Sequence, residues 1–157
     1  MRRRDKEVTD RVTMELIIKG SSVCRLGLSD DNRPYVIPVC FGFSDNTLYF
    51  HSAHEGKKID ILKKNNNVCF EFDIDHEIVA ADNPCNWTMK YRSVVGFGKV
   101  SIIEGAQEKR NVLAMIMEQY SDKMVLDNEM NIDHLVVFKV SIDSMTAKVS
   151  GYMPLEI

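Results

Sequence analysis

The sequence predicts a mainly β protein with flanking helices, arranged as a small antiparallel barrel that is closed or partly open. Two observations lead to this prediction. Short apolar runs of strand length follow one another along the chain, and several links between them are too short for the crossover that parallel strands need. About six such runs and three helical segments fit a single domain over residues 1–157. Closing the strands into a barrel removes exposed strand edges, which promote aggregation.

The first third of the chain is predicted to form a helix and a three-stranded meander. Val12, Leu16 and Ile17 recur at helical spacing, and Thr9 or Asp10 is suited to cap the start of that helix. The apolar runs that follow are separated by polar turns rich in Asp and Asn, which are typical of hairpins. The helix is expected over residues 9–19, and the strands over 23–28, 34–43 and 47–51.

A short second helix and a fourth strand are predicted next. The helix is expected over residues 56–64, with Ile59 and Leu62 facing inward, and the three asparagines after it end the helix. Alternating apolar residues predict a strand over residues 68–74. In the less regular stretch that follows, Trp87 is expected to pack over the barrel or over a site.

The last third is predicted to hold a fifth strand, the clearest helix and a closing pair of strands. Gly96 and Gly98 within the fifth strand indicate a bulge or a close backbone approach. The closing pair is expected to turn around Asp143 and Ser144. These elements are expected over residues 93–103, 106–120 and 135–149.

Composition excludes several classes of function. The net charge of −3 creates no field that would favour nucleic acid or an acidic membrane surface. No apolar run approaches the length of a membrane span and the N-terminus lacks a signal-peptide core, so a cytoplasmic protein is expected. The cysteines form no Cys-x-x-Cys pair and are expected to be free thiols, and no metal site is expected. They are Cys24, Cys40, Cys69 and Cys85.

Two adjacent lysines, Lys57 and Lys58, open the predicted second helix. Cations are disfavoured at a helix N-terminus because the helix dipole and unpaired N–H groups already present positive charge there. An anion bound at that position, typically a phosphate, would explain the pair. The alternative is that both lysines are solvated surface residues. The hydroxyl of Ser52 could donate to the same anion or cap the helix.

Three stretches of the chain, in this order, carry a likeness to a known family. They are residues 33–43 (RPYVIPVCFGF), residues 47–53 (TLYFHSA) followed by Gly56, Lys57, Lys58 and Leu62, and residues 89–98 (MKYRSVVGFG). The chain resembles the pyridoxamine 5′-phosphate oxidase-like flavin-binding split barrels, and within them the nitroimidazole-resistance (Nim-type) branch. The resemblance implies a six-stranded antiparallel split barrel. It also implies a homodimer that holds FMN at the subunit interface.

The resemblance also implies which residues bind the cofactor. The strand with Pro38, Val39 and Cys40 would lay its backbone along the isoalloxazine ring. Ser93 matches a flavin-contacting position where the oxidase branch typically has Gln. The implied phosphate-binding residues are His51, Ser52, Lys57 and Lys58.

His51 is also the candidate catalytic residue. Nim-type proteins carry a histidine in the flavin groove that is assigned to substrate chemistry, and His51 matches it. A neutral imidazole there could donate to a phosphate, to flavin or to a nitro group. The alternative is a half-buried histidine at a strand end whose ring bonds to the backbone.

The function implied is that of an FMN-dependent oxidoreductase acting on a small electron-poor substrate, such as a nitroaromatic of the 5-nitroimidazole type, with NAD(P)H as electron donor. Two alternatives are a flavin-binding module without turnover and a haem-binding split barrel. Pyridoxamine phosphate oxidase activity itself is not expected, because the Trp and Arg pattern of that family's C-terminus is missing after Leu135, through the tail 151–157.

Overall fold

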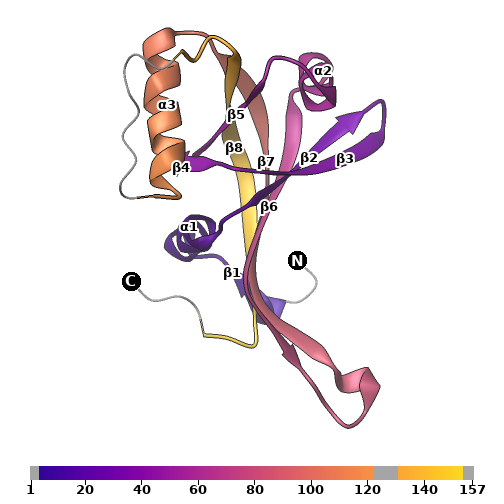
Figure 1. Ribbon diagram of the computed structural model, residues 1–157. Coiled ribbons are helices and arrows are strands. Elements are labelled where there is room, and N and C mark those ends of the chain that lie inside the picture. The colour runs from indigo at the N-terminus through magenta and orange to yellow at the C-terminus, as the bar shows by residue number, and fades with distance from the viewer. Residues whose placement is uncertain (1–3, 122–130, 154–157) are drawn as a thin grey trace.

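The computed structural model describes residues 4–121 and 131–153, which form one antiparallel sheet and three helices (Figure 1). Six strands have seven residues or more, as predicted, and two short strands add to them. The strands are β1 (Glu7–Val8), β2 (Cys24–Asp30), β3 (Arg33–Val39), β4 (Gly42–Ser44), β5 (Thr47–Ala53), β6 (Asn67–Val79), β7 (Thr88–Ile103) and β8 (Leu135–Ser150). The α-helices are α1 (Arg11–Gly20), α2 (Lys57–Lys64) and α3 (Ala106–Glu118), and Arg4–Lys6 and Pro84–Asn86 are single 3₁₀ turns.

The sheet is curled almost shut, which confirms the split-barrel prediction. Its strand order is β3-β2-β6-β7-β8-β5-β4, with β1 paired to β8, so β3 and β4 lie at opposite ends of the path. Only three residue steps separate Val39 at the end of β3 from Gly42 at the start of β4. Three steps span at most about 11 Å, so the two ends of the sheet must come close together. The loop between β3 and β4 therefore closes the barrel at this point. Because β3 does not pair with β4, one edge of β3 has no partner strand among the described residues.

Tight turns set the register of the first two hairpins. Asp31 and Asn32 join β2 to β3, and all four turn residues, including Asp45 and Asn46 between β4 and β5, have positive φ angles of 48° to 67°. Two consecutive residues of this conformation form the turn whose twist matches that of paired strands. Asn and Asp tolerate it at low cost, so these polar pairs fix the alignment of the strands.

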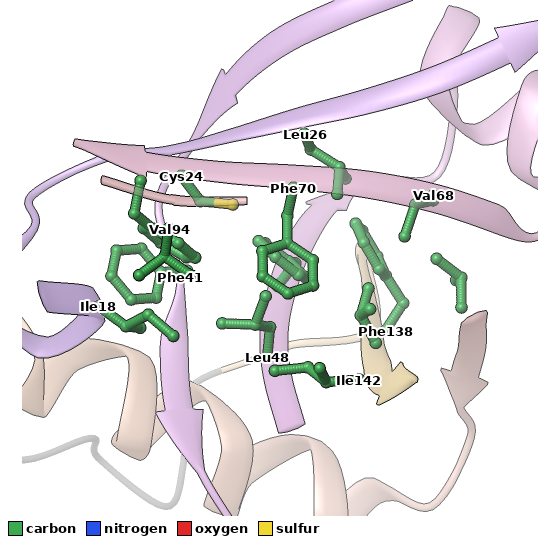
Figure 2. Close-up of a cluster of buried hydrophobic side chains, with 14 of the residues drawn as sticks. Ile18, Cys24, Leu26, Phe41, Leu48, Val68, Phe70, Val94, Phe138 and Ile142 are labelled. Carbon is green, nitrogen blue, oxygen red and sulfur yellow. The ribbon is translucent and has the colours of Figure 1, made fainter. Parts of the chain in front are cut away.

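Aromatic side chains fill the barrel interior. Phe70 and Phe138 lie in its centre, above Leu48 and Ile142 (Figure 2). Gly96 faces this core from β7, where an added Cβ would lie 2.1 Å from the Phe70 ring. The close approach predicted for the glycine is therefore confirmed. The largest fully buried aromatic side chains are Phe41, Phe50, Phe70, Phe72 and Phe138.

The helices cover the barrel with faces that differ in part from the predicted ones. Asp10 caps α1 by accepting hydrogen bonds from the N–H groups of Val12 and Thr13 at 3.3 and 2.8 Å. The predicted apolar face of α1 was partly wrong, because Val12 is 43% exposed. The apolar residues of α1 that pack into the core are Met14, Ile17 and Ile18; those of α2 are Ile59 and Ile61, with Leu62 half-buried; those of α3 are Val112, Leu113 and Ile116.

Two predictions about the second half of the sheet were wrong. The expected turn at Asp143 and Ser144 is a bulge within one continuous strand. Phe97 pairs with Ser144 and Gly98 with Ile142, which leaves Asp143 as the extra residue of β8. The stretch after residue 75 extends β6 and β7 into an arm that projects from the barrel (Figure 1). Trp87 lies on that arm, 55% exposed, and its indole N–H donates to the carbonyl of Ala81.

None of the helices in the described part of the chain combines the length and apolar character needed to span a bilayer. The expectation that the chain lacks the oxidase family's C-terminal Trp and Arg pattern concerns residues up to 157, and the structure describes this tail only as far as Met153. Residues 154–157 lie outside the described residues.

Candidate functional site

A groove between β3 and the start of α2 brings together four of the predicted site residues. Its volume is about 300 Å³. Pro38 and Val39 form part of one wall, and Lys57 and Lys58 form part of the other. The complete lining of this β3–α2 groove is Tyr35, Ile37, Pro38, Val39, Gly56, Lys57 and Lys58.

The start of α2 makes one end of the groove electropositive. Gly56 is the N-cap residue, with φ of 123°, and no side chain caps the helix. The first backbone bonds of the helix run from the N–H groups of Ile59 and Asp60 to the carbonyl of Gly56, at 2.9 and 3.2 Å. The N–H groups that precede them have no intrahelical acceptor and add their partial charge to the lysine ammonium groups. This end is therefore suited to a phosphate.

The two lysines differ in environment. The ammonium group of Lys57 lies 4.7 Å from the ring centre of Tyr35, a cation–π contact that holds the exposed side chain over β3. Burial lowers the pKa of Lys58, because desolvation disfavours its charged form. A bound anion would offset the free-energy cost of burying the charged ammonium group of Lys58.

The open edge of β3 offers backbone groups to the groove. Asp30 and Arg33 flank a two-residue turn and so form a hydrogen-bonded pair, and such pairs alternate along the hairpin. By this alternation the backbone groups of Pro34, Val36 and Pro38 point away from β2. Both prolines occupy positions whose N–H would face no partner strand, which fits their lack of a donor. The carbonyls of these residues and the N–H of Val36 remain free to bind a ligand.

Val39 behaves differently from its neighbours on the strand. It pairs with Cys24 in the hydrogen-bonded row, so its backbone groups are engaged with β2. Only its side chain, which packs against the core and lines the groove, can contact a ligand there. Of the residues predicted to lay their backbone along a cofactor, Pro38 fits this role and Val39 does not.

Ser52 carries an unsatisfied polar group on β5, and it does not line the β3–α2 groove. It continues the inward-facing row of Leu48 and Phe50 on β5 and is only 5% exposed. Its hydroxyl has no hydrogen-bond partner among the described residues. A buried unpaired hydroxyl costs free energy, and the large majority of buried polar groups in native proteins have a hydrogen-bond partner. The free hydroxyl is consistent with the predicted anion ligand and shows that Ser52 does not cap α2.

His51 points to the opposite face of β5 from Ser52, because successive side chains of a strand alternate. Burial lowers the pKa of His51, and the positive charge of Lys58 lowers it further. The ring is therefore neutral at pH 7. Its sensitivity to Lys58 places it within electrostatic reach of the groove, although it does not line the groove.

Cys40 and Ser93 do not line the groove. Cys40 is exposed just beyond β3, where the N–H of the next residue donates to the hydroxyl of Tyr120 at 3.0 Å. Ser93 lies on β7, paired with Asp73 on β6, and β6 and β2 separate β7 from β3. Within one chain, Ser93 is not brought to the other predicted residues.

Three groove residues were missed from the sequence: Tyr35, Ile37 and Gly56. Tyr35 and Ile37 alternate with the prolines on β3, and this two-residue period could have identified them as groove-facing once Val39 was chosen. Among the described residues, no group of three or more His, Cys, Asp or Glu side chains is arranged to hold a metal ion. Every cysteine there is a free thiol.

Comparison with known proteins agrees with this architecture. The chain is similar to a candidate 5-nitroimidazole antibiotic resistance protein from Bacteroides thetaiotaomicron, with 38% identity over 91% of this chain and 86% of that chain and a TM-score of 0.81. It also shares its fold with the flavocytochrome Anf3 from Azotobacter vinelandii, with 20% identity over 100% and 75% of the two chains and a TM-score of 0.83. An FAD and haem binding protein from Mycobacterium smegmatis has 18% identity over 97% and 77% of the two chains and a TM-score of 0.84.

A search of curated proteins gave no match. The family model described as pyridoxamine 5′-phosphate oxidase matches residues 10–149, which include every strand from β2 to β7 and nearly all of β8. This match and the likeness to the Bacteroides protein confirm the family resemblance found in the three sequence stretches. The chain belongs to the pyridoxamine 5′-phosphate oxidase family.

Proposed function

We propose that this chain binds FMN in the β3–α2 groove and uses the reduced flavin to reduce a small electron-poor substrate, such as a nitroaromatic of the 5-nitroimidazole type. The observation that carries the proposal is the convergence of an uncapped, lysine-flanked helix start with the open edge of β3 in one groove. The likeness to the Bacteroides protein supports the substrate class. The names of the flavocytochrome and of the FAD and haem binding protein support a flavin.

The groove residues and Ser52, which lies outside the groove lining, would together hold the cofactor. Lys57 and Lys58 would pair with the phosphate, and the unpartnered hydroxyl of Ser52 would donate to it. The free backbone groups at Val36 and Pro38 would orient the ring system. When bound, FMN would carry the electrons between NAD(P)H, the expected donor, and the substrate.

His51 would act on the substrate or on the proton that accompanies reduction. Its lowered pKa keeps the imidazole neutral at pH 7, so one ring nitrogen carries a proton to donate and the other can accept one. The ring lies on the outer face of β5 and is partly desolvated there, yet enough of it is exposed for a molecule to reach it from solvent.

A second copy of the chain would complete the site. Val36, Gly27, Cys69 and Phe97 form one row across four neighbouring strands, and Val36 and Phe97 in it are 62% and 56% exposed. Exposed apolar residues in a continuous row mark an interaction surface. Ser93 alternates onto the same face of β7 as Phe97, so a homodimer packed through this face would bring Ser93 toward the partner's cofactor.

The absorbance spectrum of the purified protein, followed by titration with FMN, tests the proposal directly. We expect flavin bands as purified or saturable uptake of one FMN per chain. NADPH should then bleach the bands, and a 5-nitroimidazole should restore them. Failure to take up FMN would refute the proposal. Uptake without bleaching or reoxidation would instead favour a flavin-binding module, and a Soret band on haem titration would favour a haem protein.

Light scattering tests the proposed homodimer. Phe97→Asp should convert a dimer into monomers, because it replaces the exposed aromatic side chain at the β7 end of the row with a charge. Lys99→Asp, two residues along the same face of β7, serves as the control because its side chain lies outside that row. A wild-type chain that is monomeric at micromolar concentration would contradict the assignment.

A further inference from the structure

A second groove lies on another side of α2, between that helix and the end of the β7–β8 pair. It consists of two adjacent parts, of about 300 and about 60 Å³, whose linings share Ile59, Lys63, Ile102 and Val136. We propose that this α2–β8 groove binds an unbranched aliphatic carboxylate, at a site separate from that of the flavin.

The floor of the groove is apolar. Ile102 continues the inward-facing row of β7 and pairs with Phe138, a core residue that is 1% exposed. Although it belongs to this row, Ile102 is 54% exposed. The barrel is therefore open at this end, and the hydrophobic interior reaches solvent beneath α2. An apolar chain laid along Ile102, Val136 and Phe138 would extend the core and remove this surface from water.

The rim of the larger part carries an excess of basic groups. Lys63 reaches it from α2 and Lys109 from α3, and Glu104 is the one acidic residue of the lining. Lys63 forms no ion pair within the described residues, which leaves its ammonium group available to a carboxylate. Lys109 donates to the carbonyl of Leu135 at 3.4 Å and stays at the rim.

His54 completes the rim and is held in place. Its Nε2 lies 2.6 Å from the carbonyl oxygen of Asp133, and because a carbonyl only accepts, Nε2 carries the proton. The other ring nitrogen, Nδ1, takes no part in this hydrogen bond. The groove thus pairs a narrow apolar trough with basic groups at its wider part, which matches a ligand with an apolar chain and one negative head group.

Size and polarity favour such a ligand over others. The groove volume is at the lower end of the range of about 300–1,000 Å³ for small-molecule sites. The floor side chains Ile102, Val136 and Phe138 are all apolar, so the floor offers no polar side chain that would recognise a sugar or a base. Charge complementarity between the two lysines and a carboxylate supplies the orientation.

Calorimetric titration of the full-length protein with decanoate tests the proposal, with octanoate, hexanoate and decanol as comparisons. We expect decanoate to bind, each loss of two methylenes to weaken binding by about tenfold, and decanol to bind at least about fivefold more weakly. Decanoate should leave the affinity for FMN unchanged. Equal binding of decanol and decanoate, or displacement of FMN by decanoate, would overturn the assignment.

Two matched pairs of variants locate the site. Ile102→Asp should weaken decanoate binding by at least about tenfold, whereas Ser101→Asp adds the same charge to the opposite face of β7 and should leave it unchanged. Lys63→Gln should weaken it severalfold, and the neighbouring Lys64→Gln should not. Unchanged binding in Ile102→Asp, with folding verified by thermal unfolding, would overturn the proposal. A change of oligomeric state in Ile102→Asp without decanoate binding in the wild type would identify the groove as a subunit contact and also overturn it.

Discussion

The two grooves that share α2 offer a ligand opposite chemistry. The β3–α2 groove combines the positive start of the helix with the free backbone of an edge strand. The α2–β8 groove, formed farther along the same helix, has an apolar floor and basic groups only at its rim. One short helix therefore lines two different grooves. Its N-terminus contributes positive charge to the first, and its side covers the open apolar end of the barrel in the second. Variants along α2 should separate the two sites.

The largest effect is expected from removing both lysines of the β3–α2 groove. Lys57→Ala with Lys58→Ala should weaken FMN binding by about 3–6 kcal/mol, because hydrogen bonds to charged groups contribute about 1.5–3 kcal/mol each. Quenching of flavin fluorescence measures the affinity. The control, Lys63→Ala with Lys64→Ala, removes the same charge from the same helix and should affect FMN little. An equal loss in both double variants would show that only the net charge of the helix matters.

Ile59→Ala should disturb both grooves, because Ile59 anchors α2 to the core and is only 3% exposed. Truncation of a buried isoleucine costs about 2–5 kcal/mol in the free energy of unfolding. A helix of eight residues has little stability of its own, so both FMN and decanoate should also bind more weakly.

Urea unfolding at fixed protein concentration measures the effect of Ile59→Ala. The control is Ile78→Ala, the same change at a side chain on the arm that is 65% exposed, which should change the stability by less than about 0.5 kcal/mol. Similar losses in the two variants would contradict the anchoring role of Ile59.

Ser52→Ala should have opposite effects on the free and the flavin-bound protein. Without ligand, removal of an unpartnered buried hydroxyl should stabilise the fold by about 1 kcal/mol, since such a group costs about 1–3 kcal/mol. FMN binding should weaken by about 1.5–3 kcal/mol if the hydroxyl donates to the phosphate. Thermal unfolding with and without FMN measures both effects.

Ser150→Ala is the matched control for Ser52. Ser150 is also buried, at 3% exposed, but its hydroxyl accepts from Lys6 at 2.7 Å and donates to the carbonyl of Met89 at 3.3 Å. Its removal should destabilise the free protein. Destabilisation by Ser52→Ala in the absence of FMN would mean that its hydroxyl has a partner in the free protein.

The difference between the grooves also explains what the sequence could reveal. Lys57 and Lys58 break a local rule about charge at a helix start, and a local rule can be read from neighbouring residues. The turns and Gly96 could be predicted for the same reason. Each is set by a local requirement of the backbone, a positive φ angle in the turns and a close approach of Phe70 at Gly96. The α2–β8 groove left no such signal. Its residues come from α2, β7, α3, β8 and the loops before α2 and α3, and each of them alone resembles an ordinary core or surface residue.

The wrong predictions have a related cause. Asp143 and Ser144 are residue types that favour turns. Because β8 pairs with β7 on both sides of them, the strand continues and Asp143 forms a bulge. Trp87 was expected to be packed because large aromatic residues usually are, yet the length of the β6–β7 ladder carries it away from the barrel. The pairing of long strands depends on residues far apart in the chain, which local patterns do not specify.

The smallest expected effect concerns the pKa of His51 and distinguishes the grooves without any mutation. Burial and Lys58 hold the pKa below its ordinary value of about 6.5. The unfolded chain therefore binds the proton more readily than the native state, so the contribution of His51 to stability is present above pH 6.5 and is lost as the pH falls below it. A phosphate bound to Lys58 would offset the lysine's charge and raise the pKa of His51.

NMR titration of the His51 ring protons should thus show a higher pKa with FMN bound and no change with decanoate bound. Lys58→Gln should raise the pKa in the free protein, because it removes the positive charge that lowers the pKa there. A pKa that rises equally with decanoate would mean that the two grooves are not electrostatically separate. A pKa unaffected by saturating FMN would place the phosphate away from Lys58, and the lysine-flanked helix start would then have to be explained by solvation alone.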